Sequence, residues 1–374
     1  MTNEVKNVPE LRFPGFKDEW EEKPLKNIVN VRSGKDYKHL NKGQYPVYGT
    51  GGYMISVDEY LYDGDAIGIG RKGTINKPYL LKGPFWTVDT LFYCVPKKYN
   101  TYFILSLFKN INWKIYDEST GVPSLSKVTI NKILRKVPAN EEQQKIGDFF
   151  SKLDRQIELE EQKLEKLKEQ KKGYMQHIFS QNLRFKDGKG NDYPNWKNYK
   201  IENLLKERNE RSGEGQMLSV TINNGIIKFD ELDRKDNSSK DKSNYKVVRK
   251  GDIAYNSMRM WQGASGKSDY DGIVSPAYTV IYPTQNTSPT FIEYKFKTHR
   301  MIHEFKINSQ GLTSDTWNLK YKQLKNISMD MPILEEQEKI GKFFKKIDQL
   351  INKQKEKIEI LQENKQGFLQ KMFV

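Results

Sequence analysis

The chain repeats a long segment of itself, and this repeat limits the folds open to it more than any other feature. Residues 141–179 align without gaps on residues 335–373, with 19 of 39 positions identical. Shared helical composition could supply scattered Glu and Lys matches, but it would not also align the phenylalanine pairs or match Gly147 with Gly341. The chain is therefore an internal duplication.

The residues before these segments repeat more weakly but in the same order. The matching pairs are LRF at 11–13 and 183–185, Trp20 and Trp196, Gly64-Asp65 and Gly251-Asp252, a β-like run at 88–95 and 274–282, a helical run at 101–112 and 290–305, and Ser119-x-Gly121 and Ser309-x-Gly311. We therefore predict an α+β fold with an internal pseudo-two-fold repeat, in which two similar mixed α/β domains are each followed by a long helix. The predicted boundaries are 1–137 for the first domain, 138–180 for its helix, 181–331 for the second domain and 332–374 for its helix.

Both repeated segments have the pattern of long helices that pair with each other. Acidic pairs follow Pro138 and Pro332, and carboxylates at a helix start oppose the positive end of the helix dipole. The 39 residues would make a rod of roughly 58 Å, and their apolar residues alternate in the 4-3 spacing of a coiled-coil seam. The predicted interface is Ile146, Phe150, Leu153, Ile157, Glu160, Leu164, Leu167, Lys171, Tyr174 and Ile178 in the first rod, and Ile340, Phe344, Ile347, Ile351, Gln354, Ile358, Leu361, Lys365, Phe368 and Met372 in the second.

The polar residues in the two seams indicate the direction of pairing. A parallel, in-register pair would set Lys171 against Lys365. An antiparallel pair sets Glu160 against Lys365, and it sets Gln354 against Lys171. We therefore predict two antiparallel helices that separate the two domains. The alternative is that each helix lies separately on its own domain.

The positive charge of the chain lies in the globular domains. The 374 residues include 63 Lys+Arg and 48 Asp+Glu, for a formal net charge of +15. Residues 141–179 carry −1 and residues 335–374 carry +2, which leaves +14 for the rest. Excess positive charge in folded domains, rather than in a tail, is typical of a surface that binds a polyanion. A generally basic surface without such a partner is the alternative.

Basic, aromatic and glycine residues gather in particular loops of both halves. Arg forks and Asn or Gln amides read base edges, whereas Lys side chains and Gly backbone amides hold phosphates. We therefore predict DNA contacts from these loops, although any one of them can also be an ordinary surface loop. The candidates are Arg32, Lys35, Tyr37, Lys38, Thr50, Tyr53, Arg71, Lys72 and Thr74 in the first half, and Arg208, Arg211, Asn256, Arg259, Trp261, Gln262 and Lys267 in the second.

Motifs for other functions fail on their sequence context. Residues 68–73 match the dinucleotide fingerprint, but the residues after them cannot open the required helix. Residues 263–268 end like a P-loop, but Trp261 stands where the first glycine belongs. His299 and His303 have the spacing of two metal ligands without an obvious third. Methyltransferase and nuclease motifs are also missing from the sequence, which predicts a protein that binds rather than catalyses and that holds no metal.

Composition and the N-terminal residues limit where the protein works. With 36% hydrophobic and 12% aromatic residues, the chain has enough apolar material for folded cores. Its first residues lack the apolar stretch of a signal peptide, and the sequence has no run of about 18 apolar residues, so we expect neither secretion nor membrane spanning. Its single cysteine, Cys94, lies in an apolar run and is expected to be buried in a strand. We expect a cytoplasmic protein.

One motif opens both long helices. It comprises Pro138, Glu141, Glu142, Gln143, Ile146, Phe149, Phe150, Asp154 and Ile157, and it repeats as Pro332, Glu335, Glu336, Gln337, Ile340, Phe343, Phe344, Asp348 and Ile351. Together with the order domain, helix, domain, helix over the whole chain, this motif resembles the specificity subunit of type I restriction-modification enzymes.

The resemblance implies that each domain is a target recognition domain that reads one half of a split, asymmetric DNA site. The helices would set the spacing between the halves and dock two modification subunits, which supply S-adenosylmethionine and methylate adenine. Restriction subunits that use ATP and Mg would join them, and the chain itself would bind no cofactor. Two alternatives remain: a self-contained DNA-modifying enzyme with diverged motifs, and a coiled-coil interaction scaffold without a nucleic-acid role.

Overall fold

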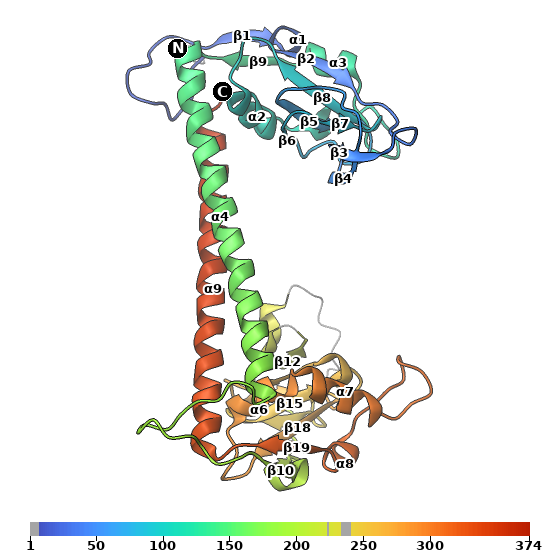
Figure 1. Ribbon diagram of the computed structural model, residues 1–374, viewed down its shortest axis with the longest axis vertical. Helices are drawn as coiled ribbons and strands as arrows, with labels where there is room; N and C mark the ends of the chain where they lie inside the picture. Colours follow the sequence, from blue (N-terminus) through green and yellow to red (C-terminus); the bar gives the residue numbers. More distant parts are fainter. Residues whose placement is uncertain (1–6, 223, 233–240) are drawn as a thin grey trace. The chain divides into compact units, whose positions relative to one another are not determined.

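The chain forms two compact units, and each unit is built from both halves of the sequence. The structure is a computed structural model that describes residues 7–222, 224–232 and 241–374. The first unit comprises Met1–Lys163 and Gln354–Val374, and the second comprises Leu164–Lys353. Each unit therefore holds one globular domain, the start of one long helix and the end of the other (Figure 1).

Both domains are organised around a four-stranded antiparallel sheet with equivalent strand order. The order is β2-β8-β5-β6 in the first unit and β11-β18-β15-β16 in the second. The strands are β2 (Val29–Ser33), β5 (Ala66–Gly70), β6 (Tyr79–Leu81) and β8 (Leu91–Pro96), and then β11 (Leu205–Glu207), β15 (Ile253–Asn256), β16 (Ser265–Lys267) and β18 (Tyr278–Pro283). The duplication predicted from the sequence is thus present in the sheets as well as in the helices.

Short helices and one ribbon complete each frame. The ribbons pair β1 (Glu21–Pro24) with β9 (Leu134–Val137), and β10 (Lys197–Lys200) with β19 (Ser328–Met331). The helices are α1 (Leu25–Ile28), α2 (Thr101–Asn110), η1 (Trp113–Tyr116) and α3 (Lys127–Lys132) in the first unit, and α5 (Ile201–Leu204), η2 (Phe229–Glu231), η3 (Met260–Gln262), α6 (Pro289–Phe296), α7 (His299–Ile307) and α8 (Tyr321–Leu324) in the second. The predicted run 290–305 is two helices, because Thr298 adopts extended backbone and its side chain caps α7 by accepting from Met301 N.

The elements added to this frame differ between the units. The first unit adds the sheet β4-β3-β7, and the second adds the two ribbons β12-β13 and β14-β17. Their bounds are β3 (Lys42–Gly49), β4 (Gly52–Val57) and β7 (Trp86–Thr87), and then β12 (Leu218–Thr221), β13 (Gly225–Lys228), β14 (Lys246–Val248) and β17 (Gly272–Val274). The same four-stranded frame therefore carries a different set of added strands in each unit.

Each domain core is closed by a phenylalanine at or just beyond the end of the long helix that begins in the other half of the chain. In the first unit, Phe373 stacks on Phe103 with ring centroids 5.6 Å apart. In the second unit, the equivalent Phe179 stacks on Phe344 with centroids 5.8 Å apart. Burying one such side chain stabilises a fold by roughly 1.5 to 3 kcal/mol. The helix ends are therefore part of the cores and not appended to them.

The start of each long helix is fixed to its domain by the same buried ion pair. Glu142, 1% exposed, accepts hydrogen bonds from Nε (2.7 Å) and Nη2 (2.8 Å) of Arg12 and from Nε1 of Trp20 (3.2 Å). In the second unit Glu336 accepts from Nε (3.1 Å) and Nη2 (2.6 Å) of Arg184 and from the indole of the equivalent tryptophan (3.2 Å). A bidentate Arg–carboxylate pair fixes geometry as well as charge. The second glutamate of the helix-start motif, Glu142 or Glu336, therefore anchors the helix to its domain.

The glutamine that follows this glutamate also binds the domain in both units. Gln143 donates from Nε2 to the carbonyl of Pro138 (2.8 Å), and its Oε1 accepts from the backbone N–H of Asn100 (3.4 Å). Gln337 repeats the arrangement, with its Oε1 accepting from the N–H of Ser288 (2.9 Å). Asn100 and Ser288 are the N-caps of α2 and α6, so each glutamine links the long helix to the first helix of its domain.

Within each unit the two long helices run antiparallel, as the polar seam residues predict. Helix α4 spans Asn140–Phe179 and helix α9 spans Leu334–Lys371. In the first unit, Phe149 near the start of α4 packs edge-on against Phe368 near the end of α9, with centroids 5.0 Å apart. In the second unit, Tyr174 near the end of α4 packs against Phe343 near the start of α9 at 5.1 Å. In the described part of the chain, α4, α9 and every other helix are too short or too polar to cross a membrane.

The helix register predicted from the seam is wrong by about two helical turns. Glu160 was expected to face Lys365, but its carboxylate accepts from Gln354 Nε2 (2.7 Å) and Lys357 Nζ (2.8 Å) instead. Lys163 Nζ adds a third bond at 3.2 Å. Glu160 is 5% exposed, so its carboxylate is buried in the helix pair of the first unit, while Lys163 and Lys357 reach it from the exposed edge of the pair.

The two seam lysines bind aspartates that lie one position beyond the seam. Lys365 pairs with Asp154 in the first unit. Lys171 pairs with Asp348 at 2.6 Å in the second unit, rather than with Gln354. Each aspartate also binds a side chain from its own domain's α2 or α6. The predicted register is wrong because both lysines pair with these flanking carboxylates and not with polar residues of the opposite seam.

Replacing Glu160 with Gln should make the helix pair of the first unit less dependent on pH. Bonds from Lys357, Gln354 and Lys163 hold the pKa of Glu160 at about 2, below its ordinary value of 4.5. A depressed carboxyl pKa stabilises the fold above about pH 4.5, and this stabilisation is lost as the pH falls toward 2. Urea unfolding followed by circular dichroism should show the variant less stable at neutral pH, with the difference shrinking in acid. Glu165→Gln, in an exposed pair with Lys168, is the control; a wild-type to variant difference that stays constant with pH would refute this account.

Candidate nucleic-acid interface

In the first unit, two of the predicted segments share strand β7 as a common support. The backbone N–H of Lys35 donates to the carbonyl of Thr87 (2.9 Å), and the N–H of Val88 donates to the carbonyl of Tyr48 (3.0 Å). Tyr48 lies on β3, which pairs with β7. The segment 32–38 and the β3–β4 hairpin are therefore held beside each other.

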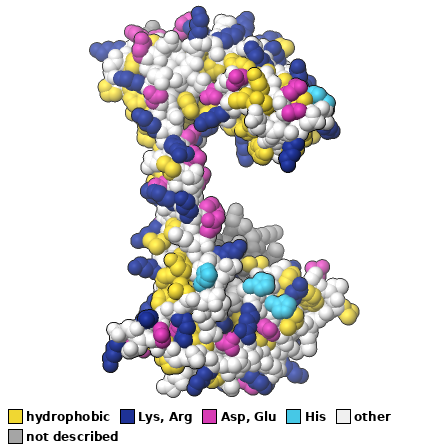
Figure 2. Space-filling model, in the orientation of Figure 1, with side chains coloured by type: hydrophobic (Ala, Val, Ile, Leu, Met, Phe, Trp, Pro, Cys, Tyr) yellow, Lys and Arg dark blue, Asp and Glu magenta, His cyan; other side chains and the backbone are white. Residues whose placement is uncertain are grey.

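The side chains on these two segments differ in exposure. Tyr53 at the hairpin turn is 63% exposed, and the neighbouring Met54 is 52% exposed. Lys35 and Lys38 are exposed, Tyr37 and Thr50 are half-buried, and the guanidinium of Arg32 lies over the ring of Tyr62 at 5.3 Å. Hydrophobic side chains lie among Lys and Arg side chains on the drawn face of this domain (Figure 2). A two-stranded ribbon of this kind fits the major groove of DNA.

The third predicted segment of the first unit forms one surface with a loop that follows η1. The backbone N–H of Gly73 donates to the carbonyl of Pro123 (2.8 Å), and the N–H of Leu125 donates to the carbonyl of Arg71 (2.9 Å). Arg71 and Lys72 are exposed, while Thr74 in the same segment is half-buried. The backbone bonds therefore support two exposed cations on a fixed loop.

The second unit repeats this pairing of two loops. The backbone N–H of Leu319 donates to the carbonyl of Ser257 (2.8 Å), which ties the loop 309–318 to the predicted segment after β15. The indoles of Trp261 and Trp317 pack edge to face, with centroids 5.2 Å apart. Sequence reasoning missed Trp317, although the Ser-x-Gly match in the repeat had marked the loop that carries it.

The four candidates that lead from β15 through η3 have different environments. Arg259 is exposed, whereas Trp261 and Gln262 are half-buried. The side chain of Asn256 is half-buried and accepts a hydrogen bond from Met258 N (3.0 Å), which shapes the turn. Arg259 is thus the most accessible of the four.

Lys297, the residue that follows the end of α6, also supports this loop, although the sequence did not single it out. Its ammonium donates to the carbonyl of Gly263 and to that of Ile222 (3.0 Å). Burial lowers the pKa of Lys297 to about 8. Gly263 has φ +83°, a left-handed conformation that suits glycine, so the chain can close η3 at this point.

Arg208 is committed to the fold of the second unit. Its Nε and Nη2 donate to the two carboxylate oxygens of Asp252 at 2.6 and 2.9 Å, and Asp252 is 3% exposed. The hydrogen bond with Asp252 raises the pKa of Arg208. The guanidinium also lies over the ring of Tyr282 at 5.0 Å. Because a buried carboxylate needs its cation, the first role of Arg208 is to hold the turn before β15.

Arg211 and Lys267 also have partners within the chain. Arg211 donates from Nη1 to the carbonyl of Asn244 (2.8 Å), and the ammonium of Lys267 pairs with Asp269. This pairing lowers the pKa of Asp269. Contact with DNA by these two residues stays a prediction.

The remaining singled-out residues have ordinary environments. Cys94 is buried on β8, and burial raises the pKa of its thiol. His299 and His303 are exposed on α7. Among the residues that the structure describes, His, Cys, Asp and Glu side chains form no group of three that could hold a metal ion.

These features define a class of protein. One structural frame occurs twice in the chain, and each copy carries its own set of paired outer loops with exposed cations and aromatic rings. The frames are joined to paired helices by identical buried contacts. The chain is a duplicated recognition protein whose two domains differ in the surfaces they present.

Comparison with known families identifies this class. The sequence matches the type I restriction modification DNA specificity domain over residues 17–169 and again over residues 193–362. The chain therefore belongs to this family, and its two repeated domains are recognition domains of a DNA specificity subunit.

Solved structures share the fold. The crystal structure of the S subunit of a type I restriction-modification system from M. genitalium is similar over 98% of this chain and 99% of that chain, with a TM-score of 0.65 and 14% identity. A chain from a structure of the type I R-M system, solved to explain its complex assembly and conformational transition, is similar over 97% of this chain and 98% of its own length, with a TM-score of 0.51 and 15% identity. At these identities the likeness concerns the fold alone.

Proposed function

We propose that each unit reads one half of a split, asymmetric DNA site and that the paired helices set the distance between the halves. The observation that carries this proposal is the duplicated frame with unlike loops. Equivalent four-stranded sheets and identical joints support a β3–β4 hairpin in one unit and the Trp261–Trp317 loops in the other. Two equivalent frames that carry different loops would suit the recognition of two different short DNA sequences.

We further propose that this chain recognises DNA for catalytic partners. Two modification subunits would dock on the helices and supply S-adenosylmethionine, and restriction subunits would supply ATP-dependent cleavage with Mg. One of the similar structures concerns the assembly of a type I R-M complex, which supports partners of this kind. The purified chain alone should leave DNA unmethylated and uncut; activity of the chain alone would favour the self-contained enzyme instead.

Binding to duplex DNA should weaken steeply as salt increases. The net charge outside the two repeated helical segments is +14, and each phosphate that a protein neutralises contributes about −0.9 to the slope of log affinity against log salt. We expect a slope of roughly −4 or steeper for the chain assembled with its modification subunits. Fluorescence anisotropy with a labelled duplex at several salt concentrations measures it. Absence of binding at low salt would favour the scaffold alternative, and a flat salt response would contradict phosphate contacts.

Changing Arg71 or Arg259 to Ala should affect different halves of the site. Both side chains are exposed on the equivalent two-loop surfaces of their units. If each bonds a base edge, its loss should cost about 1 to 3 kcal/mol and relax specificity in one half only. Selection of bound duplexes from a randomised library measures both effects. Each variant is the matched control for the other, and uniform weakening in both would assign them to phosphates.

A further inference from the structure

The loop pair of the second unit presents apolar side chains to solvent on a rigid base. Leu312 is fully exposed, and Met258 is 44% exposed. The loop that carries Leu312 is closed by backbone bonds between Gln310 and Asn318 at 2.8 and 3.0 Å. The edge-to-face tryptophan pair and the bond from Leu319 to Ser257 fix this loop to the one beside it. When a leucine on a fixed loop binds a partner, the backbone loses little further conformational entropy. A leucine on a free tail would lose much more.

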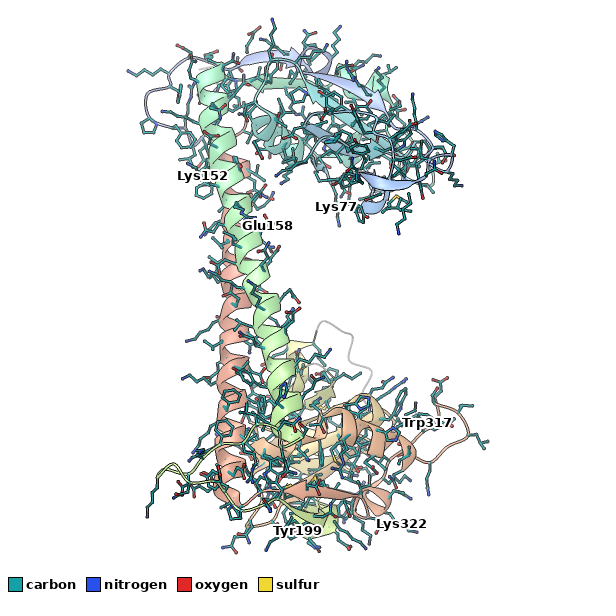
Figure 3. The ribbon with its side chains drawn as sticks, viewed as in Figure 1. Lys77, Lys152, Glu158, Tyr199, Trp317 and Lys322 are labelled. Carbon is teal, nitrogen blue, oxygen red and sulfur yellow. The ribbon has the colours of Figure 1, made fainter. Side chains whose placement is uncertain are left out.

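Two cations lie on or beside the same loop pair. The ammonium of Lys306 lies 5.6 Å from the ring centroid of Trp317, and Arg259 is exposed on the adjoining loop. Trp317 lies on the side of the second unit away from its helix segments (Figure 3). The side chain of Leu312 is wholly in solvent on a loop closed by backbone bonds, so it is available to a partner. A partner that satisfies both features needs an anionic exterior and flat apolar groups within reach, which is the chemistry of duplex DNA.

We propose that Leu312 is a wedge that enters the DNA duplex at one base-pair step of the half-site read by the second unit. The Trp317–Trp261 pair fixes the loop that carries Leu312, and Arg259 and Lys306 would hold nearby phosphates. This inference rests on the proposed function and adds to it a means of reading DNA by its deformability. Apolar side chains that enter a step unstack it, and the cost depends on the sequence, being lowest at flexible pyrimidine–purine steps.

The first unit has a different surface at the equivalent place. Its second loop carries Val122, 67% exposed, and the segment before that loop carries Ile115, also 67% exposed. The rings packed between the loops of the second unit are replaced here by backbone bonds from Gly73 and Leu125. Val122 is one carbon shorter than leucine, and its loop is braced by these backbone bonds where a tryptophan pair braces the loop of Leu312. The wedge is therefore assigned to the second unit.

The test uses the full chain assembled with its modification subunits. Duplexes carry 2-aminopurine, whose emission rises when it is unstacked, in place of one adenine of the half-site at a time, on either strand. We expect one step in the half-site of the second unit to brighten on binding. Leu312→Ala should abolish this signal and lower affinity about tenfold, which is the loss typical of one base-pair contact. Leu312→Met should retain both. The control is Ile307→Ala, a change at another exposed apolar side chain, at the end of α7 and outside the loops.

The outcomes separate the wedge from the proposed function. Specific binding without brightening at any step would overturn the wedge and leave the recognition function standing. Loss of modification subunits from Leu312→Ala with unchanged DNA binding would assign the patch to a protein partner and overturn the wedge. Failure of the wild-type complex to select any DNA sequence would overturn the proposed function itself.

Discussion

Replacing Arg12 with Ala should lower the free energy of unfolding of the first unit by about 3 to 5 kcal/mol. The change leaves the carboxylate of Glu142 buried at 1% exposure, with the indole of Trp20 as its remaining side-chain donor. An unpaired buried charge is far costlier than the small net contribution of an intact pair, because its desolvation is no longer offset. Arg184→Ala should have the same effect in the second unit, through Glu336.

Hydrogen exchange resolved by peptide measures the two units separately in the full chain. Arg12→Ala should raise exchange in the first unit, and Arg184→Ala should raise it in the second. Lys371→Ala is the matched control, because it removes an exposed pair with Glu10 at 3.2 Å, and such pairs contribute about 0 to 1 kcal/mol. Equal effects of Arg12→Ala and Lys371→Ala would contradict the structural role of the buried pair.

Deleting one heptad from both long helices at facing positions should change the spacing of the DNA site. In the observed register Glu160 faces Gln354 and Lys357, so the deletions are 158–164 and 354–360. They remove this polar cluster as a whole and leave the remaining layers matched. The helices shorten by about 10 Å, which corresponds to about three base pairs.

Methylation of a duplex library with variable spacers by the reconstituted complex measures the effect. Both half-sites should still be read, at a spacing about three base pairs shorter, provided that the domains follow the groove through roughly 100° of added rotation. The control removes 158–164 alone, which mismatches the layers and should impair assembly. An active double deletion that kept the original spacing would show that the helices do not set it.

The repeated helices were predictable because their periodicity and sequence identity are local signals. Their antiparallel direction was predictable for a related reason, since a parallel pair would have opposed Lys171 and Lys365. The register was not predictable from the seam alone. Asp154 and Asp348 lie beside the seam, where the long side chains of Lys365 and Lys171 reach them. The lysines therefore find polar partners in the observed register as well as in the predicted one.

The candidate site was only partly predictable, because a loop's composition does not show which of its charges the fold itself uses. Arg208 and Asp252 are 44 residues apart in the sequence, and their ion pair forms through the neighbouring positions of β11, β18 and β15. Leu312 and Trp317 lie in a loop without Lys or Arg, so its composition does not indicate a site that binds DNA. The packing of Trp317 on Trp261 depends on tertiary structure that no local pattern records.

Mapping of methylated adenines in cells that express the chain with its modification subunits tests the central claim most directly. If each unit reads one half of a split site, every methylated adenine should lie in one motif of two short defined parts separated by a spacer of fixed length and undefined sequence. Arg71→Ala and Arg259→Ala should then alter separate parts of that motif. A single contiguous motif, or the same methylation in cells without the chain, would contradict the account.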